Sequence, residues 1–222
     1  MLSINTIVVP QGAEYQAVCR GLARDKIKNV RVVSIPIGVR QMKRVLSDYS
    51  EIIDNSSGIL IMGLCGSLSS TWAIGDAVSI ESCENINHNV VKLDTQLTAK
   101  INKKLAIETV AALTSDRIIT LAQEKLNLAR QYSASIVEME GYSYVVELQQ
   151  RDRAVAMLRV VSDDSHSDIP DLNRTIDSQG NLKSLPMAIG LIKQPLAAVR
   201  LIRGSLAGLK TLEQITAKLF SV

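Results

Sequence analysis

Aromatic side chains are scarce in this sequence, and its charges are nearly balanced. Phe, Trp and Tyr together make up 3% of the 222 residues, and the formal net charge is +3. Proteins that bind single-stranded nucleic acid stack bases on aromatic rings, and nucleic-acid binders in general present a strongly basic surface. Neither property is present, so we expect no nucleic-acid partner.

Cysteine and histidine are also rare. The three cysteines are odd in number and lack the spacing of metal ligands, which favours reduced thiols in a cytoplasmic protein. The two histidines, His88 and His166, lie far apart in the sequence. His166 has Asp163, Asp164 and Asp168 near it, and this group is either a metal cluster or a polar loop. The polar loop is the better interpretation, so we expect no metal and no cofactor.

Motifs that identify several common enzyme classes are missing. The sequence contains no G-x-x-x-x-G-K-[ST] phosphate-binding loop, no G-x-G-x-x-G fingerprint after a strand and no G-x-S-x-G nucleophile elbow. No apolar run reaches the ~18 residues needed to span a bilayer, and the first ten residues resemble a strand more than a secretory leader. These features favour a cytoplasmic protein.

The residues that are present predict an α/β fold. Hydrophobic residues make up 46% of the chain and charged residues 21%, which is enough for a sizeable core. Short apolar runs alternate with helical patterns, but from 58 to 113 several strands follow with little helix between them. We therefore expect a mixed, partly closed central sheet flanked by helices. One domain is predicted over 1–222, with a helical tail over 186–222 that is kinked at Pro195.

Acidic side chains stand where predicted strands end. Glu138 and Glu140 are two residues apart and would point to the same face of a strand, and Asp163 closes the next apolar run. Glu14 and Asp116 occupy similar places. Open α/β sheets bind ligands at the carboxyl ends of strands, which suggests one pocket, although solvated strand ends would look the same. Such a set would suit cleavage of a glycosidic bond, in which one acid protonates the leaving group and another activates water.

Three segments resemble one known family. V-E-M-E-G (137–141), R-V-V-S-D (159–163) and I-M-G-L-C-G-S-L-S-S-T-W-A-I-G-D (61–76) resemble the purine nucleoside phosphorylase / methylthioadenosine nucleosidase superfamily. The resemblance covers about residues 4–165. It implies an enzyme with a single α/β domain and a mixed central sheet that acts on a small nucleoside and forms homo-oligomers.

The resemblance also implies roles for individual residues. Glu140 would bind the ribose hydroxyls, and Met139 would pack on the sugar. Asp163 would protonate the purine ring as the base leaves, with Ser162 and Arg159 in support.

The water-activating residue of the nucleosidases matches Glu14, although an acid favoured by a helix N-terminus would also stand there. Gly63 and Gly66 are predicted to lie in a small-residue loop that lets a ligand approach the backbone. Glu138 is expected only to pack or to cap the strand.

The sequence departs from the family where phosphate would bind. Phosphorylases of the family carry an arginine and a serine where this chain has Ile61 and Leu64, which favours water over phosphate as the nucleophile. A cation supplied by Arg40 of a neighbouring subunit would leave phosphorolysis open.

The predicted base-binding segment departs from the family as well. Ile118 stands where small nucleosidases have an aromatic ring, next to a backbone contact to the base expected near Ile119. Asp116 would reach the adenine amino group. The implied purine site is therefore aliphatic.

The C-terminal sequence, D-L-N-R-T-I-D-S-Q-G-N-L-K (171–183) followed by a long apolar and basic helical tail, resembles the hopanoid-associated branch of the family, whose members are thought to remove adenine from adenosylhopane. Its tail combines an apolar face with basic side chains, as expected of a helix on an anionic membrane surface or of a core or oligomer helix. The predicted function is hydrolysis of the N-glycosidic bond of an adenine nucleoside with a bulky or apolar 5′ group. A nucleoside phosphorylase and a catalytically degenerate nucleoside-binding protein are the alternatives.

Overall fold

The computed structural model describes residues 3–24, 26–38, 42–175, 183 and 191–221. Arg40 and the first residues of the predicted tail, 186–190, lie outside this part of the chain. The strands are β1 (Thr6–Pro10), β2 (Arg31–Ile35), β3 (Ile59–Ser67), β4 (Ala77–Asn85), β5 (Val90–Lys92), β6 (Thr109–Thr114), β7 (Ile136–Glu138) and β8 (Val155–Asp163). The helices are α1 (Ala13–Arg24), α2 (Met42–Asp48), α3 (Ser50–Asp54), α4 (Thr95–Leu105), α5 (Ala122–Tyr132), α6 (Gly141–Gln149) and α8 (Pro195–Phe220), with a short 3-10 turn η1 (Asn173–Thr175).

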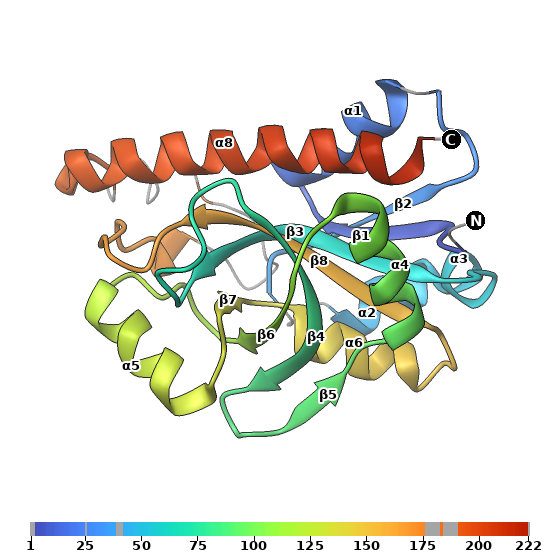
Figure 1. The fold of residues 1–222 in the computed structure, drawn as a ribbon, viewed down its shortest axis with the longest axis horizontal. Coiled ribbons are helices and arrows are strands. Elements are labelled where there is room, and N and C mark those ends of the chain that lie inside the picture. Colours follow the sequence, from blue (N-terminus) through green and yellow to red (C-terminus); the bar gives the residue numbers. More distant parts are fainter. Residues whose placement is uncertain (1–2, 25, 39–41, 176–182, 184–190, 222) are drawn as a thin grey trace.

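The strands form one mixed sheet that closes on itself (Figure 1). β3, β8, β4, β6 and β7 each pair with the next strand, and β7 pairs back with β3. β1 and β2 extend the sheet in parallel from β3, and β5 lies antiparallel beside β4. Three of the five pairs in this ring are parallel and two are antiparallel, which confirms the predicted mixed and partly closed sheet.

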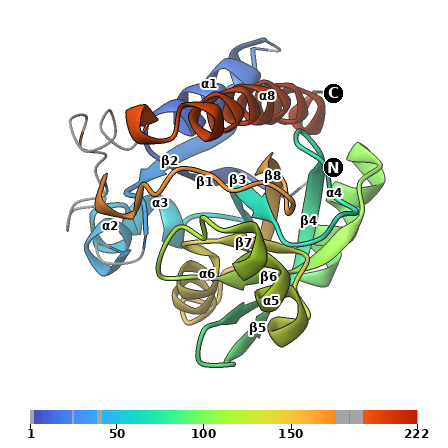
Figure 2. The ribbon, with the colours of Figure 1, turned by 90° about the vertical axis from the view of Figure 1, so that its left-hand side faces the viewer.

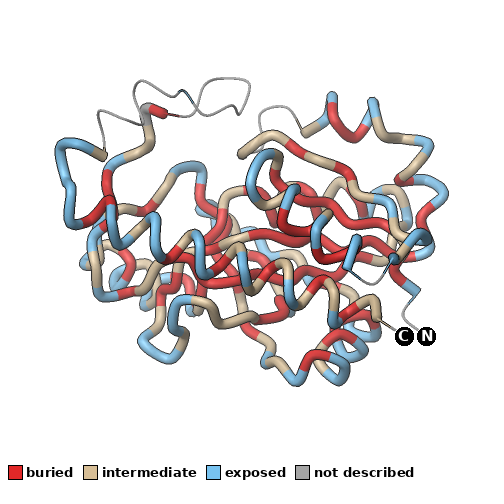
Figure 3. The backbone as a smooth tube through the Cα atoms, turned by 90° about the horizontal axis from the view of Figure 1, so that it is seen from above, coloured by how far each residue is buried: buried red, intermediate tan, exposed pale blue. Residues whose placement is uncertain are grey.

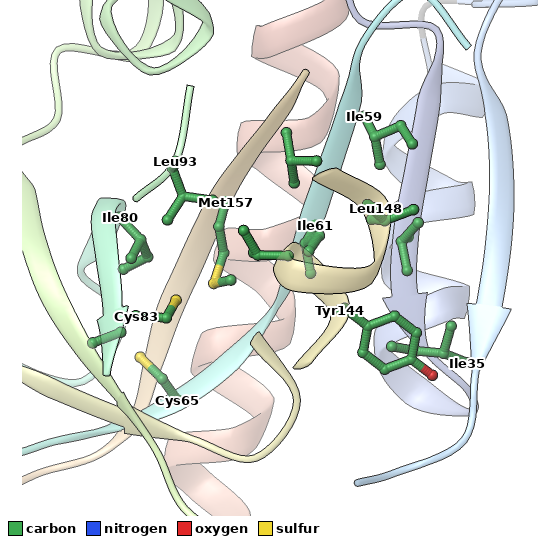
Figure 4. Packing of buried hydrophobic residues seen from close by; sticks show 14 of the residues in the cluster. Ile35, Ile59, Ile61, Cys65, Ile80, Cys83, Leu93, Tyr144, Leu148 and Met157 are labelled. Carbon is green, nitrogen blue, oxygen red and sulfur yellow. The ribbon is translucent and has the colours of Figure 1, made fainter. Parts of the chain in front are cut away.

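The sheet has two apolar faces because side chains alternate along each strand. Leu60 and Met62 of β3 pack with residues of α1 and α8 on one face, where these two helices lie side by side (Figure 2). Ile59 and Ile61 point to the opposite face and pack with Tyr144 of α6 (Figure 4). The strands are buried along most of their length, whereas exposure is concentrated on the outer faces of helices and in loops (Figure 3).

Helix α8 approaches the end of β8 very closely. A Cβ atom at Gly204 would overlap the carbonyl oxygen of Ser162, and one at Gly208 would lie 2.9 Å from Leu64 Cδ2. Glycine at both positions lets the helix backbone rest directly on the two strands. α8 thereby forms a wall over the carboxyl end of β8.

Three local predictions differ from the structure. β3 continues to Ser67, so Gly63 and Gly66 lie in a strand and not in the predicted loop. The helical spacing of apolar residues predicts one helix over 40–53, whereas the described part of this segment forms α2 and α3. Pro195 begins α8 instead of kinking a longer helix, because proline fits the first turn, where its missing N–H has no helical partner to lose. No helix among the described residues is long and apolar enough to cross a bilayer.

Candidate active site

A cavity of about 290 Å³ lies where β3 parts from its neighbours. On one edge, β3 pairs with β1 at residues 59–61 and with β7 at residues 66–67, so the edge between them carries no strand. Ligands of α/β sheets bind where neighbouring strands diverge in this way. Most of the predicted site residues line this cavity: Glu14, Gly66, Ile118, Ile119, Met139, Glu140, Ser162 and Asp163.

Asp163 is aimed by an irregularity in β8. The register of β3 and β8 shifts after the pair Cys65 and Val161, so that Gly66 faces Asp163 and Ser162 becomes an extra residue. A bulge of this kind turns the following side chain. The single hydroxyl proton of Ser162 is shared between the carbonyl oxygen of Cys65 at 3.1 Å and Asp163 Oδ1 at 3.0 Å. The strand end therefore fixes the carboxyl group against the cavity.

Gly63 and Gly66 make space for functional side chains. A Cβ atom at Gly66 would lie 2.8 Å from Asp163 Oδ2. One at Gly63 would overlap Arg159 Nη1 and lie 2.9 Å from Glu14 Oε1. The sequence predicted that these glycines let a ligand approach the backbone, whereas in the structure they lie within β3 and leave room for protein side chains. Gly66 lines the cavity and Gly63 does not.

Glu14 belongs to the first turn of α1, yet its carboxylate turns away from its own helix. Glu14 Oε1 accepts a 2.7 Å hydrogen bond from the backbone N–H of Leu64, on the unpaired edge of β3. Burial raises the pKa of Glu14 to about 7, the hydrogen bond from Leu64 opposes that rise, and the charge of Glu140 adds to it. A carboxyl group with this pKa can act as a base at neutral pH.

Arg159 is buried among three carboxylates. Its side chain is 1% exposed and forms an ion pair with Glu138, while Glu140 Oε2 lies 3.8 Å from Nη2. Burial works against the charged guanidinium, but Glu138, Glu140 and Glu14 outweigh it and raise the pKa of Arg159. Arg159 Nε and Nη1 have no hydrogen-bond partner among the described residues. Buried N–H groups in this state are normally satisfied by water or a ligand.

Glu138 has a larger structural part than the expected packing role. Besides the Arg159 ion pair, Glu138 Oε2 accepts hydrogen bonds from the backbone N–H groups of Glu140 at 3.0 Å and Gly141 at 2.7 Å. The Thr114 hydroxyl donates to its other oxygen. Glu138 thus caps the start of α6 and holds the backbone on which Met139 and Glu140 sit.

Glu140 lines the cavity, and one of its carboxylate oxygens is held by a hydrogen bond. Its Oε1 accepts a 2.9 Å hydrogen bond from the backbone N–H of Gly38, in the loop after β2. Burial and the neighbouring charge of Glu138 raise the pKa of Glu140, whereas Arg159 and the bond from Gly38 lower it. The other oxygen remains on the side of Arg159. A carboxylate held in this way suits a pair of sugar hydroxyl groups.

The predicted base-binding residues divide into two groups. Ile118 and Ile119 line the cavity. The Asn173 side chain accepts from the backbone N–H of Ile118 at 2.8 Å and donates to its carbonyl oxygen at 3.1 Å, which clamps this loop. Asp116 is exposed and does not line the cavity. Asp116 lies in a turn that is closed by hydrogen bonds between the Ser115 hydroxyl and the backbone of Arg117. The structure therefore does not place Asp116 with the other predicted site residues.

The place where phosphate would bind contains no spare cation among the described residues. Ile61 is buried in the core, and Leu64 lines the cavity beside the Glu14 carboxylate. Arg159 already faces three carboxylates. A phosphate dianion here would meet net negative charge, which agrees with the departure seen in the sequence.

Sequence reasoning missed one charged residue altogether. Lys125 of α5 is fully buried, and its Nζ forms an ion pair with Asp163 and donates to the carbonyl oxygen of Asp164 at 2.5 Å. A signal was available, because Leu128, Ala129 and Tyr132 follow at helical spacing and form the inward face of α5. A lysine on that face needs a buried partner.

The acidic loop around His166 holds backbone and not a metal cluster. Asp164 Oδ1 accepts from the backbone N–H groups of His166 at 2.9 Å and Ser167 at 2.7 Å, and Asp168 Oδ1 accepts from Ala122 at the start of α5. No cluster of three or more potential metal ligands occurs within the described ranges. The Asp164 carboxylate is used by a local turn, and the Asp168 carboxylate binds the start of α5.

Comparison with known proteins identifies the family. Residues 27–184 match the family model described as "Phosphorylase superfamily". The chain belongs to the phosphorylase superfamily. The sequence-based assignment to this superfamily, as an enzyme that is either a nucleosidase or a nucleoside phosphorylase, is thereby confirmed. A search of curated protein sequences found no significant match.

Solved structures of purine nucleosidases share the fold of this phosphorylase-superfamily chain. The 5′-methylthioadenosine/S-adenosylhomocysteine nucleosidase of Helicobacter pylori matches with a TM-score of 0.65 and 14% identity, over 97% of this chain and 98% of that one. The 5′-methylthioadenosine nucleosidase of Arabidopsis thaliana matches with a TM-score of 0.67 and 13% identity, over 97% and 94%. Futalosine hydrolase of H. pylori matches with a TM-score of 0.64 and 15% identity, over 97% and 95%.

Proposed function

We propose that this protein hydrolyses the N-glycosidic bond of an adenine nucleoside. The observation that supports the proposal is that Glu14, Glu140 and Asp163 line one cavity, with Arg159 buried beside the two glutamates. Asp163 is the acid that protonates the leaving base, and Glu14 is the base that takes a proton from the attacking water. Glu140 binds the ribose hydroxyls, and Met139 packs on the sugar.

Water is the nucleophile that this geometry suits best. Arg159 Nη1, which has no hydrogen-bond partner among the described residues, lies beside Glu14, so a water molecule there could donate to the carboxylate and accept from the guanidinium. Glu14, Glu138 and Glu140 leave little net positive charge for a phosphate dianion. The Cys65 thiol also lines the cavity, but burial raises its pKa far above the usual range, so it is not a reactive nucleophile.

An apolar or bulky 5′ group is supported by the rest of the lining. Beyond the acids, the cavity wall is mainly aliphatic, with contributions from Ile37, Leu64, Ile169, Leu172 and Leu201. Aliphatic side chains gain free energy by covering apolar surface but discriminate its exact shape only weakly. The class of 5′ substituent is therefore part of the proposal, and adenosylhopane is one candidate within it.

Product analysis tests the proposal directly. Purified protein is incubated with methylthioadenosine, adenosylhomocysteine, inosine and an adenosyl lipid, each with and without phosphate. We expect free adenine and a free reducing sugar that do not depend on phosphate, and Asp163→Asn to abolish adenine release while the fold persists. Phosphate-dependent formation of a sugar 1-phosphate would establish a phosphorylase instead. Binding of these nucleosides without release of any base would establish a degenerate binding protein.

A peripheral membrane contact is the second part of the proposal, and α8 supports it. One face of α8 is buried in the core, but Leu196 is 79% exposed and Leu206 62% exposed, with Val199 and Ile202 between them. Exposed Arg200, Arg203 and Lys210 lie on the same helix. An apolar row with basic neighbours suits an anionic lipid surface beside the cavity wall formed by Leu201.

Vesicle binding distinguishes the possible occupants of this row. We expect co-sedimentation with phosphatidylglycerol vesicles, little with phosphatidylcholine vesicles, and a loss in Leu196→Ser/Leu206→Ser. Ala207→Ser, an exposed change on the same helix, serves as the control. The predicted homo-oligomer remains a prediction. If a second copy of the chain covers the row, the double variant should have a lower mass in solution than the wild type. The wild type should then bind neither kind of vesicle.

A further inference from the structure

The side chain of Lys125 contacts Asp163 from the direction of α5. Lys125 is 0% exposed. Its Nζ forms an ion pair with Asp163 Oδ2 and donates to the carbonyl oxygen of Asp164 at 2.5 Å. The helix also packs Leu128, Ala129 and Tyr132 against the sheet, so Lys125 is the charged member of an otherwise largely apolar inward face.

Packing alone does not account for a lysine at this position. Transfer of an ammonium group from water to the interior costs several kcal/mol, and replacing a buried ion pair with apolar residues is often neutral or stabilising. An aliphatic residue at position 125 would fill the same face at lower cost. The contact with Asp163 is therefore the feature that needs a functional explanation.

Asp163 is held by groups from three segments. Lys125 of α5 holds Oδ2, Ser162 of β8 holds Oδ1, and Gly66 of β3 leaves the space that the carboxyl group occupies. Two hydrogen-bonded oxygens fix both the position and the plane of the carboxyl group. General acid catalysis depends on that plane, because the proton must be delivered along the direction of a ring nitrogen.

We propose that Lys125 is a positioning residue for proton delivery by Asp163. The proposal rests on the proposed N-glycosidase function. As the bond between C1′ and the base nitrogen breaks, its electron pair moves to the base. Asp163, a carboxylate in its ion pair with Lys125, first takes up a proton from solvent when the substrate binds; this proton moves to a ring nitrogen, which leaves neutral adenine and a carboxylate. The attacking water gives its hydroxyl to C1′ and its proton to Glu14, which later returns that proton to solvent. Lys125 keeps its own protons, holds the carboxyl plane and offsets the charge that appears on Asp163.

The dependence on the leaving group tests this role. Adenine needs a proton as it leaves, whereas 4-nitrophenolate leaves as a stable anion. Lys125→Met is therefore compared with wild type on the best adenine nucleoside and on 4-nitrophenyl riboside. We expect kcat for the adenine substrate to fall about 100-fold with KM nearly constant, and kcat for the nitrophenyl riboside to stay within about threefold. Asp163→Asn should show the same split, and Lys100→Met, which removes an exposed lysine of α4, should change neither rate.

Each other outcome overturns the proposal in a recognisable way. Equal losses on both substrates would make Lys125 a structural residue only. An unchanged adenine rate in a folded Lys125→Met protein would show that Asp163 does not need it. If that variant does not fold by circular dichroism, Lys125→Arg keeps the cation, and its loss should again be confined to the adenine substrate. A wild-type protein that cleaves neither substrate would overturn the proposed function itself, and the role of Lys125 with it.

Discussion

The backbone N–H of Leu64 donates a 2.7 Å hydrogen bond to Glu14 Oε1. This contact joins α1 to the part of β3 between its pairing with β1 and its pairing with β7, where this edge of β3 has no neighbouring strand. An N–H group that would otherwise pair with a neighbouring strand is used to orient a carboxylate. The divergence of the strands and the placement of Glu14, the proposed catalytic base, thus have one structural origin.

Glu14 should set the acid limb of the pH–rate profile. A base works only when ionised, and burial raises the pKa of Glu14 to about 7, so kcat/KM should rise with pH up to that value and then level off. Glu14→Gln should lower kcat about 100-fold or more and remove this limb. Rates from pH 5 to 9 check both points. A limb that persists in the variant would assign it to another group.

The same carboxyl group should make the fold less stable at high pH. The pKa of this carboxyl group is higher in the folded than in the unfolded protein, so ionisation destabilises the fold. The free energy of unfolding should therefore fall as pH rises from about 4.5 through 7. Because Glu14 is partly exposed, we expect Glu14→Gln to gain about 2 kcal/mol at pH 8 and almost nothing at pH 4. Urea unfolding at the two pH values measures the difference. Equal stability at pH 8 would contradict the burial of this carboxylate.

Glu140 should act through the sugar hydroxyls. Removing the carboxylate with Glu140→Ala should lower kcat/KM for a riboside about 100-fold, because paired hydroxyl groups lose a charged acceptor in a buried site. For a dideoxy analogue of the same substrate, the variant should lower kcat/KM much less, because this analogue has no hydroxyl groups for Glu140 to bind even in the wild type. The two substrates measured on both proteins form a cycle, and equal losses would show that Glu140 acts elsewhere.

Gly66→Ala should reduce activity more than its effect on stability explains. The new Cβ atom would lie 2.8 Å from Asp163 Oδ2, so the carboxyl group must move from its place between Lys125 and Ser162. We expect at least a tenfold loss of kcat. Gly75→Ala is the matched control, because its strain comes from a φ of +93° and its new methyl group meets only Thr211 Oγ1, at 3.7 Å. Thermal unfolding and kcat measured for both variants separate crowding from strain, and equal activity losses would refute the argument.

Leu201→Asn should change specificity for the 5′ group. Leu201 of α8 lines the cavity, and a polar amide there would face apolar substrate surface. We expect kcat/KM to fall 10- to 100-fold for a nucleoside with a long apolar 5′ substituent and to change little for adenosine. A parallel loss for both would place Leu201 against the base or the ribose.

The sequence predicted the mixed, partly closed sheet from local signals, and it predicted part of the cavity lining from acids at strand ends and from the resemblance to the family. Apolar runs mark the strands, and Met139, Glu140, Ser162 and Asp163 lie in short contiguous segments at strand ends. Lys125 was missed because its role depends on a contact between residues 38 positions apart in the chain. The loop predicted around Gly63 and Gly66 failed for a related reason, since β3 is extended there by pairing with distant strands and not by its own residue preferences.

The two glycines of α8 that rest on the ends of β8 and β3 have a consequence for how the enzyme is made. Synthesis proceeds from the amino end, so every acidic residue of the site leaves the ribosome before the helix that walls it. Until α8 docks, the carboxyl end of β8 is open to bulk water. Nascent chains of this protein should therefore contain the proposed catalytic acids before the cavity that encloses them is complete.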